Sequence, residues 1–125
     1  MTTLPEEVSK KWEEREGPAV FTTVNENGEP NAIYVSCIRK RNEEQFVIAD
    51  NYFDKTKTNI KNGSYGSILF ITEDHDAFQI KGSISYHEDG DIYDEMKDWL
   101  DPKYPAHAAT VLHVEQVYQG ADRLA

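Results

Sequence analysis

The stretch AVFTTVNENGEPNAIYVSCI, residues 19–38, decides the fold of this chain. Residues 19–24 and 31–38 are rich in β-branched and aromatic side chains, which favour strands. The loop between them contains Asn25-Glu26-Asn27-Gly28, and Asn-Gly at the tip of a short loop is a strong signal for a tight turn. The stretch therefore predicts a β-hairpin.

Further strands follow the hairpin. Residues 45–49 form an apolar run that would return as the third strand of a meander, after a turn at residues 41–44. Residues 66–71 and 77–86 predict two more strands, the second with a bulge or bend at Gly82. In that second strand, Phe78 and Ile80 alternate with polar residues, so one face should be buried. Residues 108–118 predict a last, long strand.

Three short helices are predicted between these strands. The first has Thr3 as its N-cap and stops at Gly17. The second begins at Lys55 behind Asp54 as N-cap and ends at Asn62-Gly63. The third spans residues 91–100, where Ile92, Met96 and Trp99 recur at helical spacing and indicate core packing.

The order of these elements indicates a mainly β protein with short helices. About six strands alternate with three helices and no βαβ repeat, and 125 residues make one domain, residues 1–125. A short chain with six mostly antiparallel strands favours a closed or nearly closed barrel. The sequence therefore predicts a six-stranded antiparallel split β-barrel.

Charge and cysteine content limit the classes of partner. The net charge of -10 disfavours binding to nucleic acid or to an anionic membrane surface. The single cysteine, Cys37, excludes an internal disulfide and fits a small buried side chain in a strand. We find no leader pattern at residues 1–7 and no apolar run of about 20 residues, so we expect a cytoplasmic protein without a membrane segment.

Residues 50–60, DNYFDKTKTNI, predict a phosphate site. The unpaired N–H groups at the start of a helix attract anions, and Lys55 and Thr56 add a cation and a hydroxyl there. The alternative is a solvated helix start rich in Lys and Thr. Charge supports the phosphate site, because residues 39–61 carry +2 while the remainder of the chain carries -12. A local positive segment suits a small anionic ligand better than a long polyanion.

No catalytic residue stands out from the sequence. The serines show no hydrolase motif beside a histidine. The four histidines lack metal-ligand spacing on a shared element, so no metal site is predicted.

Several segments, taken in order, resemble the FMN-binding split β-barrel family, which includes small FMN-binding proteins, flavin reductases and pyridoxamine 5'-phosphate oxidases. The resemblance covers nearly the whole chain. The segments that carry it are residues 19–23, Gly28-Glu29-Pro30, residues 31–36, residues 50–60 and Phe78-Gln79-Ile80-Lys81-Gly82.

The resemblance implies a homodimer with FMN at its interface and assigns roles to nine residues. Lys55 and Thr56 match the phosphate-binding pair, and Tyr34, Val35 and Ser36 match a strand that runs along the flavin. Ala49, Asp50 and Asn51 match the neighbouring wall, and Tyr104 is placed where a ring from the partner subunit would approach. Alternatives remain open: a cross-strand contact for Tyr34, strand-end polar roles for Ser36 and Asp50, and closure of a loop by Tyr104.

The resemblance implies an FMN-binding flavoprotein that passes electrons between a small-molecule donor or redox protein and an acceptor. The C-terminal residues 117–125 lack the arginine and histidine arrangement of the pyridoxamine phosphate oxidases, which argues against that oxidase activity. The alternatives are a non-enzymatic module that binds flavin, haem or another small anionic ligand, and a dimeric scaffold without a ligand. The absence of a dinucleotide glycine fingerprint favours FMN over FAD.

Overall fold

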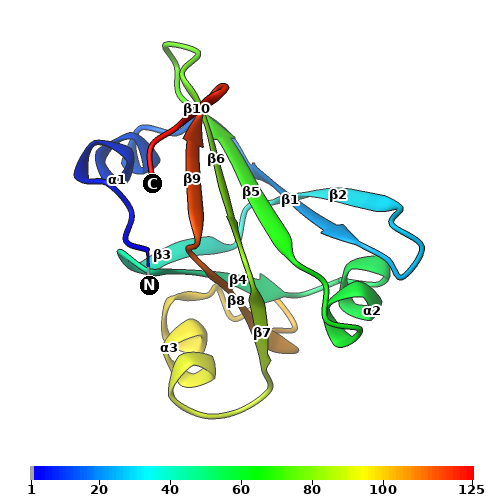
Figure 1. Cartoon of the computed structure of the whole chain (residues 1–125). Helices are drawn as coiled ribbons and strands as arrows, with labels where there is room; N and C mark the ends of the chain where they lie inside the picture. The colour runs from blue at the N-terminus through cyan, green and yellow to red at the C-terminus, as the bar shows by residue number, and fades with distance from the viewer. Residues whose placement is uncertain (1) are drawn as a thin grey trace.

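The computed structural model describes residues 2–125 and consists of two antiparallel sheets with three short helices (Figure 1). The larger sheet has the strand order β10-β9-β6-β5-β1-β2, and the smaller has the order β3-β4-β8-β7. The strands are β1 (Ala19–Val24), β2 (Pro30–Val35), β3 (Ile38–Asn42), β4 (Gln45–Asp50), β5 (Gly66–Ile71), β6 (Ala77–Gly82), β7 (Ile84–His87), β8 (Ala108–His113), β9 (Gln116–Gln119) and β10 (Asp122–Arg123). The chain is mainly β, as predicted, but residues 2–125 form ten strands in two sheets instead of six in one barrel, and the barrel is not closed.

Three of the predicted strands are each divided between the two sheets. The predicted strand 31–38 ends as β2 at Val35 and resumes as β3 at Ile38. The predicted strands 77–86 and 108–118 separate in the same way into β6 and β7, and into β8 and β9. Periodicity does not show these breaks, because the apolar alternation continues while the hydrogen-bonding partner changes. The predicted bend at Gly82 is confirmed, since β6 ends there.

The hairpin of β1 and β2 is confirmed, with Val20 opposite Tyr34. The predicted meander is wrong, because β3 and β4 pair in the other sheet. The predicted turn at 41–44 begins too early, since β3 continues to Asn42 and pairs there with Gln45. Cys37 lies in the short link between β2 and β3 and is half-buried, not a buried strand residue.

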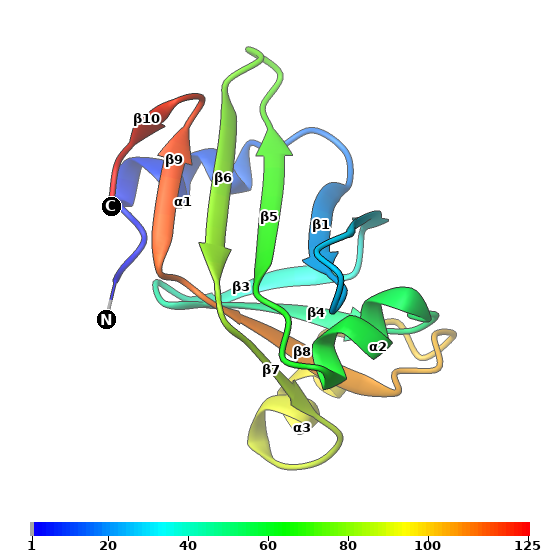
Figure 2. The ribbon, with the colours of Figure 1, turned by 45° about the vertical axis from the view of Figure 1, so that its right-hand side comes forward.

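The main core lies between the sheets and is closed by α1 (Glu6–Glu13). Figure 2 shows α1 passing behind β9, β6 and β5. The Trp12 ring packs edge-on against Phe46 of the smaller sheet at 4.9 Å and against Phe70 of the larger sheet at 5.0 Å. The predicted limits of this helix were wrong: Pro5 takes the N-cap position instead of Thr3, and the helix ends at Glu13.

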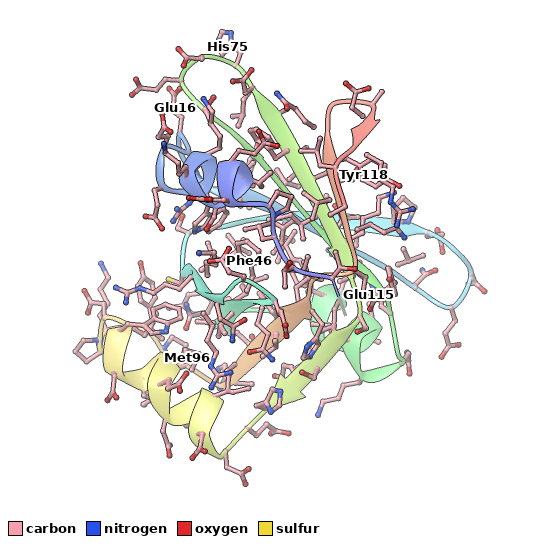
Figure 3. The ribbon with its side chains drawn as sticks, turned by 60° about the vertical axis from the view of Figure 1, so that its left-hand side comes forward. Glu16, Phe46, His75, Met96, Glu115 and Tyr118 are labelled. Carbon is pink, nitrogen blue, oxygen red and sulfur yellow. The ribbon has the colours of Figure 1, made fainter. Side chains whose placement is uncertain are left out.

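A second core cluster lies under α3 (Asp91–Trp99), on the other face of the smaller sheet. Met96 is fully buried there, and Ile92 and Trp99 pack around it, so the predicted core role is confirmed. Phe46 and Met96, labelled in Figure 3, mark the two clusters.

The helix α2 (Lys55–Lys61) begins and ends as predicted, with Asn62 as C-cap and Gly63 at φ 84°. Asp54 occupies the N-cap position, but its side chain makes no capping hydrogen bond. Asp54 is therefore the N-cap by position only, and the short helix is held by the burial of Thr56, Asn59 and Ile60. Among residues 2–125, no helix has the length and apolar character needed to cross a bilayer.

Candidate functional site

A cavity of about 350 Å³ opens where the chain leaves the larger sheet and enters the smaller one. Its walls come from the end of β2, the end of β4 and the loop before β8. Ten residues line it: Ile33, Tyr34, Val35, Ser36, Cys37, Ala49, Asn51, Tyr52, Phe53 and Tyr104. Six of the nine predicted site residues therefore meet in one place, namely Tyr34, Val35, Ser36, Ala49, Asn51 and Tyr104.

The crossing between the sheets creates this cavity. Because β2 is the last strand of the larger sheet, no further strand pairs with its outer edge in this sheet. Beyond Val35 the chain turns into the smaller sheet, where the N–H of Ala49 donates to the Cys37 carbonyl at 2.9 Å. This bond brings the end of β4 beside the end of β2 and leaves a hollow between them.

Asn51 fixes one wall of the cavity. Its side-chain oxygen accepts a hydrogen bond from the N–H of Ala106 at 3.1 Å, and Ala106 adopts a left-handed conformation with φ 49°. The Ala106 carbonyl accepts a further bond from the Tyr93 hydroxyl at 2.9 Å. A non-glycine residue in this conformation is strained, and the two bonds hold it there. Asn51 thereby positions the loop that carries Tyr104.

Polar groups without protein partners also face this region. Ser36 is exposed, and none of the hydrogen bonds found within residues 2–125 uses its hydroxyl. None of these hydrogen bonds uses the side-chain nitrogen of Asn51 either, whereas its side-chain oxygen accepts the bond from Ala106. A hydroxyl and an amide donor beside an otherwise apolar wall are the usual composition of a small-molecule site.

Two tyrosines at the cavity are exposed to an unusual degree. Tyr34 and Tyr52 each keep 78% of their surface exposed. Tyr104, which the resemblance placed where a ring from the partner subunit would approach, is half-buried and lines the cavity of its own chain. Tyr52 and Phe53 were missed as site residues, although they lie inside the segment 50–60 that the sequence marked.

Lys55 and Thr56 lie outside this cavity. Lys55 lines a separate hollow of about 380 Å³ together with Asn31, Glu29 and Asp54. Thr56 is buried, and its hydroxyl oxygen accepts a hydrogen bond from the Asn31 side chain at 3.0 Å. The two hollows are neighbours along β2, which contributes Pro30 and Asn31 to one and Ile33–Val35 to the other.

Asp50 does not line the cavity either, because its carboxylate is buried on the other side of β4. It accepts hydrogen bonds from the Phe53 N–H at 3.0 Å and from the Tyr86 hydroxyl. Burial and the bond to Asp50 raise the pKa of Tyr86. Asp50 therefore shapes the turn that presents Tyr52 and Phe53. Tyr86 has no sequence signal that would pair it with Asp50.

Several cations of the positive segment are already paired. Arg41 bonds Glu95 at 2.7 Å, Lys61 bonds Glu88 at 3.3 Å, and Lys40 bonds Glu43. Arg39, Lys55 and Lys57 have no carboxylate within 4.0 Å in the part of the chain that the structure describes. They are the cations available to an anionic ligand.

A sequence model of the family described as pyridoxamine 5'-phosphate oxidase matches residues 4–123. The chain belongs to this family. The match confirms the resemblance on which the site residues were predicted.

Three individual proteins are similar to this member of the family. The uncharacterized protein MJ0282 of Methanocaldococcus jannaschii is 27% identical over 121 residues, covering 92% of this chain and 79% of its own. An FMN-binding protein from Syntrophomonas wolfei has a TM-score of 0.75 at 20% identity, with 96% and 98% of the two chains covered. The heme storage protein HutZ of Vibrio cholerae has a TM-score of 0.64 at 14% identity, with 94% and 95% covered. At these identities the two solved structures share the fold with this chain.

Proposed function

We propose that this protein is an FMN-binding flavoprotein that holds the flavin ring in the cavity between the ends of β2 and β4. The observation that carries the proposal is the convergence of six predicted site residues on one cavity of about 350 Å³. Its volume is in the lower part of the usual range for small-molecule sites, about 300–1,000 Å³.

The residues of the cavity suit an isoalloxazine ring. Val35, Ala49 and Phe53 supply apolar surface for a flat aromatic system, and Tyr104 adds a ring at the wall. Ser36 and Asn51 supply a hydroxyl and an amide that can hydrogen-bond the polar edge of the flavin. FMN, when bound, supplies the redox chemistry, while these side chains bind it, orient it and limit the approach of water.

The phosphate would extend along β2 toward Lys55. Asn31, in the hollow of Lys55, and Ser36, in the cavity, are five residues apart, which corresponds to about 16 Å of strand. FMN is elongated, with its ring and its phosphate at opposite ends, so it could reach both hollows. Lys55 has no ion-pair partner among residues 2–125, but Glu29 and Asp54 share its hollow and oppose an anion. Binding of the phosphate at Lys55 would therefore have to outweigh repulsion by these two carboxylates.

A homodimer would complete the site. Tyr34, Val20 and Leu69 lie side by side on the outer face of the larger sheet, because Val20 is paired with both. In the same row follow Gln79, Tyr118 and Arg123. Leu69 is 43% and Tyr34 78% exposed, on a face with few charges in a chain of net charge -10. Such a face fits a second copy of this chain, which would cover the open side of the cavity next to Tyr34.

The proposed activity is electron transfer between a small-molecule donor or a redox protein and an acceptor. The negative charge of the chain favours a basic redox protein over an acidic one.

Titration with FMN and, in parallel, with riboflavin tests the proposal. We expect FMN to bind and to lose fluorescence, and riboflavin, which lacks the phosphate, to bind more weakly. Lys55→Ala should weaken FMN binding by about 1.5–3 kcal/mol and leave riboflavin binding unchanged. Lys57→Ala removes the same charge two residues away and serves as the control. Failure of both flavins to bind would refute the proposal, and equal effects of the two variants would refute the assignment of Lys55.

Haem is the alternative ligand, because the heme storage protein HutZ shares this fold. Cys37 lines the cavity and could ligate iron, whereas no histidine of residues 2–125 lines it. The absorption spectrum of the protein titrated with haem, compared with the spectrum of Cys37→Ala, distinguishes this alternative from flavin binding.

A further inference from the structure

Two histidine rings meet at one serine hydroxyl on the smaller sheet. The Oγ atom of Ser85 lies 2.8 Å from Nε2 of His87 and 2.8 Å from Nε2 of His113. All three side chains are half-buried, so solvent reaches them. None of them lines the cavity proposed for the flavin.

The strand pairing explains why the two rings converge. Ser85 of β7 is paired with Val111 of β8, and His87 is paired with Ala109. Because side chains two residues apart share a face, Ser85 and His87 lie on the same face as Val111 and His113. Along the two strands, His87 lies on one side of the Ser85–Val111 pair and His113 lies on the other. The two rings therefore approach Ser85 from opposite directions.

The Ser85 hydroxyl can form hydrogen bonds with both Nε2 atoms at once only in one way. It carries one proton, so it donates to one Nε2 and accepts an N–H from the other. Within residues 2–125 we find no hydrogen bond to either Nδ1, and hence no contact that fixes the tautomer of either ring. Both Nε2 atoms can therefore present a lone pair to the same point when the Nδ1 atoms carry the protons.

We propose that His87 and His113 form a binding site for a late first-row divalent transition metal ion, such as Zn²⁺, Ni²⁺ or Cu²⁺, between their Nε2 atoms and on the side of the Ser85 hydroxyl that faces away from its Cβ atom. Two imidazole nitrogens directed at one point are the ligands that these ions prefer. The ion cannot take the place of the Ser85 oxygen, which is bonded to Cβ. It would lie farther out between the two rings, at about 2.0–2.1 Å from each Nε2, while the serine hydroxyl rotates away.

The remaining coordination positions would be filled by water. The Glu115 carboxylate acts on His113, but its oxygens accept hydrogen bonds from the Ser83 N–H at 2.8 Å and from the Tyr65 hydroxyl. No group of three or more potential ligands is found in residues 2–125. The site therefore has two protein ligands and should exchange its metal with solvent.

The electrostatic environment favours a cation. Asp89 and Asp91 lie two and four residues after His87, and the whole chain carries a charge of -10, while Glu88 is already paired with Lys61.

Calorimetric titration of the untagged, metal-free protein with Zn²⁺ at neutral pH tests the proposal. We expect one ion per chain, and at least tenfold weaker binding in His87→Ala and in His113→Ala. Ser85→Ala should bind Zn²⁺ within about threefold of the wild type or more tightly, because the hydroxyl is displaced. With Cu²⁺, the electron paramagnetic resonance spectrum should show coupling to imidazole nitrogen, which the double variant should lose.

His75→Asn is the matched control. Figure 3 places His75 at the tip of the β5–β6 loop, far from α3 and the smaller sheet, and asparagine tolerates its φ of 65°. This variant should bind Zn²⁺ as the wild type does. Wild-type binding no tighter than that of His87→Ala/His113→Ala would overturn the proposal, as would a loss in Ser85→Ala equal to that in the histidine variants. Thermal unfolding in EDTA shows that each variant is folded before it is titrated.

Discussion

A Cβ atom on Gly82 would lie 1.6 Å from the carbonyl oxygen of His113. At this point β6 passes into β7, and β8 into β9, so the two crossings between the sheets touch backbone to backbone. The N–H of His113 donates to the Ser83 carbonyl, and the N–H of Glu115 to the Lys81 carbonyl, both at 2.9 Å. Only glycine permits this approach.

Gly82→Ala should therefore destabilise the fold strongly. The new methyl group meets backbone that cannot rotate away, and we expect a loss of about 3 kcal/mol or more, at the upper end of overpacking effects. Gly66, its partner in the β5–β6 ladder, is the control, because a Cβ there meets the flexible end of Ile84 at 2.6 Å. Gly66→Ala should cost less, about 1–2 kcal/mol, in urea unfolding. An equal loss in both variants would contradict this explanation.

A second stability prediction concerns Trp12. It is 2% exposed and joins the two sheets through Phe46 and Phe70. Trp12→Ala should lower the free energy of unfolding by about 3–5 kcal/mol, and Trp12→Phe by less. Trp99→Ala, at a half-buried position on α3, is the comparison. If Trp99→Ala proved the more damaging change, α1 would not be the link between the sheets.

The sequence predicted the hairpin, α2, α3 and six of the ten residues that line the cavity, because each rests on local pattern or on a family motif. It did not predict that strands end at Val35 and His113, or that the bend at Gly82 is a crossing into the other sheet. A chain that passes from one sheet to the other keeps its alternation of apolar and polar residues. Only the pairing with other strands shows where one strand ends and the next begins. The pair of the buried Asp50 and the half-buried Tyr86 could not be predicted for the same reason, since the two residues are 36 positions apart in the sequence.

Tyr86 should give the stability of the protein an alkaline limit. Its folded-state pKa is raised above the ordinary value of 10.0, first by burial and then by its bond to Asp50. Unfolded chains therefore lose this proton near pH 10 while folded chains keep it, so stability falls as the pH rises above 10. Tyr86→Phe should lower the free energy of unfolding by about 1.5–3 kcal/mol at pH 7, because the Asp50 carboxylate loses the hydrogen bond that the Tyr86 hydroxyl donates to it.

The pH profile of that difference is the measurement. In thermal unfolding, the gap between the wild type and Tyr86→Phe should stay constant from pH 7 to 9 and narrow above pH 10. Tyr34→Phe, at an exposed tyrosine, should run parallel to the wild type. A difference in stability that widens above pH 10 would contradict the prediction that the contribution of Tyr86 falls with rising pH.

The proposed dimer makes a prediction at Leu69, in the middle of the exposed row on the larger sheet. Leu69→Lys would bury two charges in the interface, one from each copy, without partners, and an unpaired buried charge is costly. Sedimentation velocity should show a dimer for the wild type and a dissociation constant at least tenfold higher for Leu69→Lys. Asn62→Lys adds the same charge on the exposed end of α2 and should leave the dimer intact. Since the row ends at Tyr34 beside the cavity, Leu69→Lys should also weaken FMN binding if the second copy completes the site. A monomeric wild type would end the dimer proposal, and a dimeric Leu69→Lys would place the interface on another face.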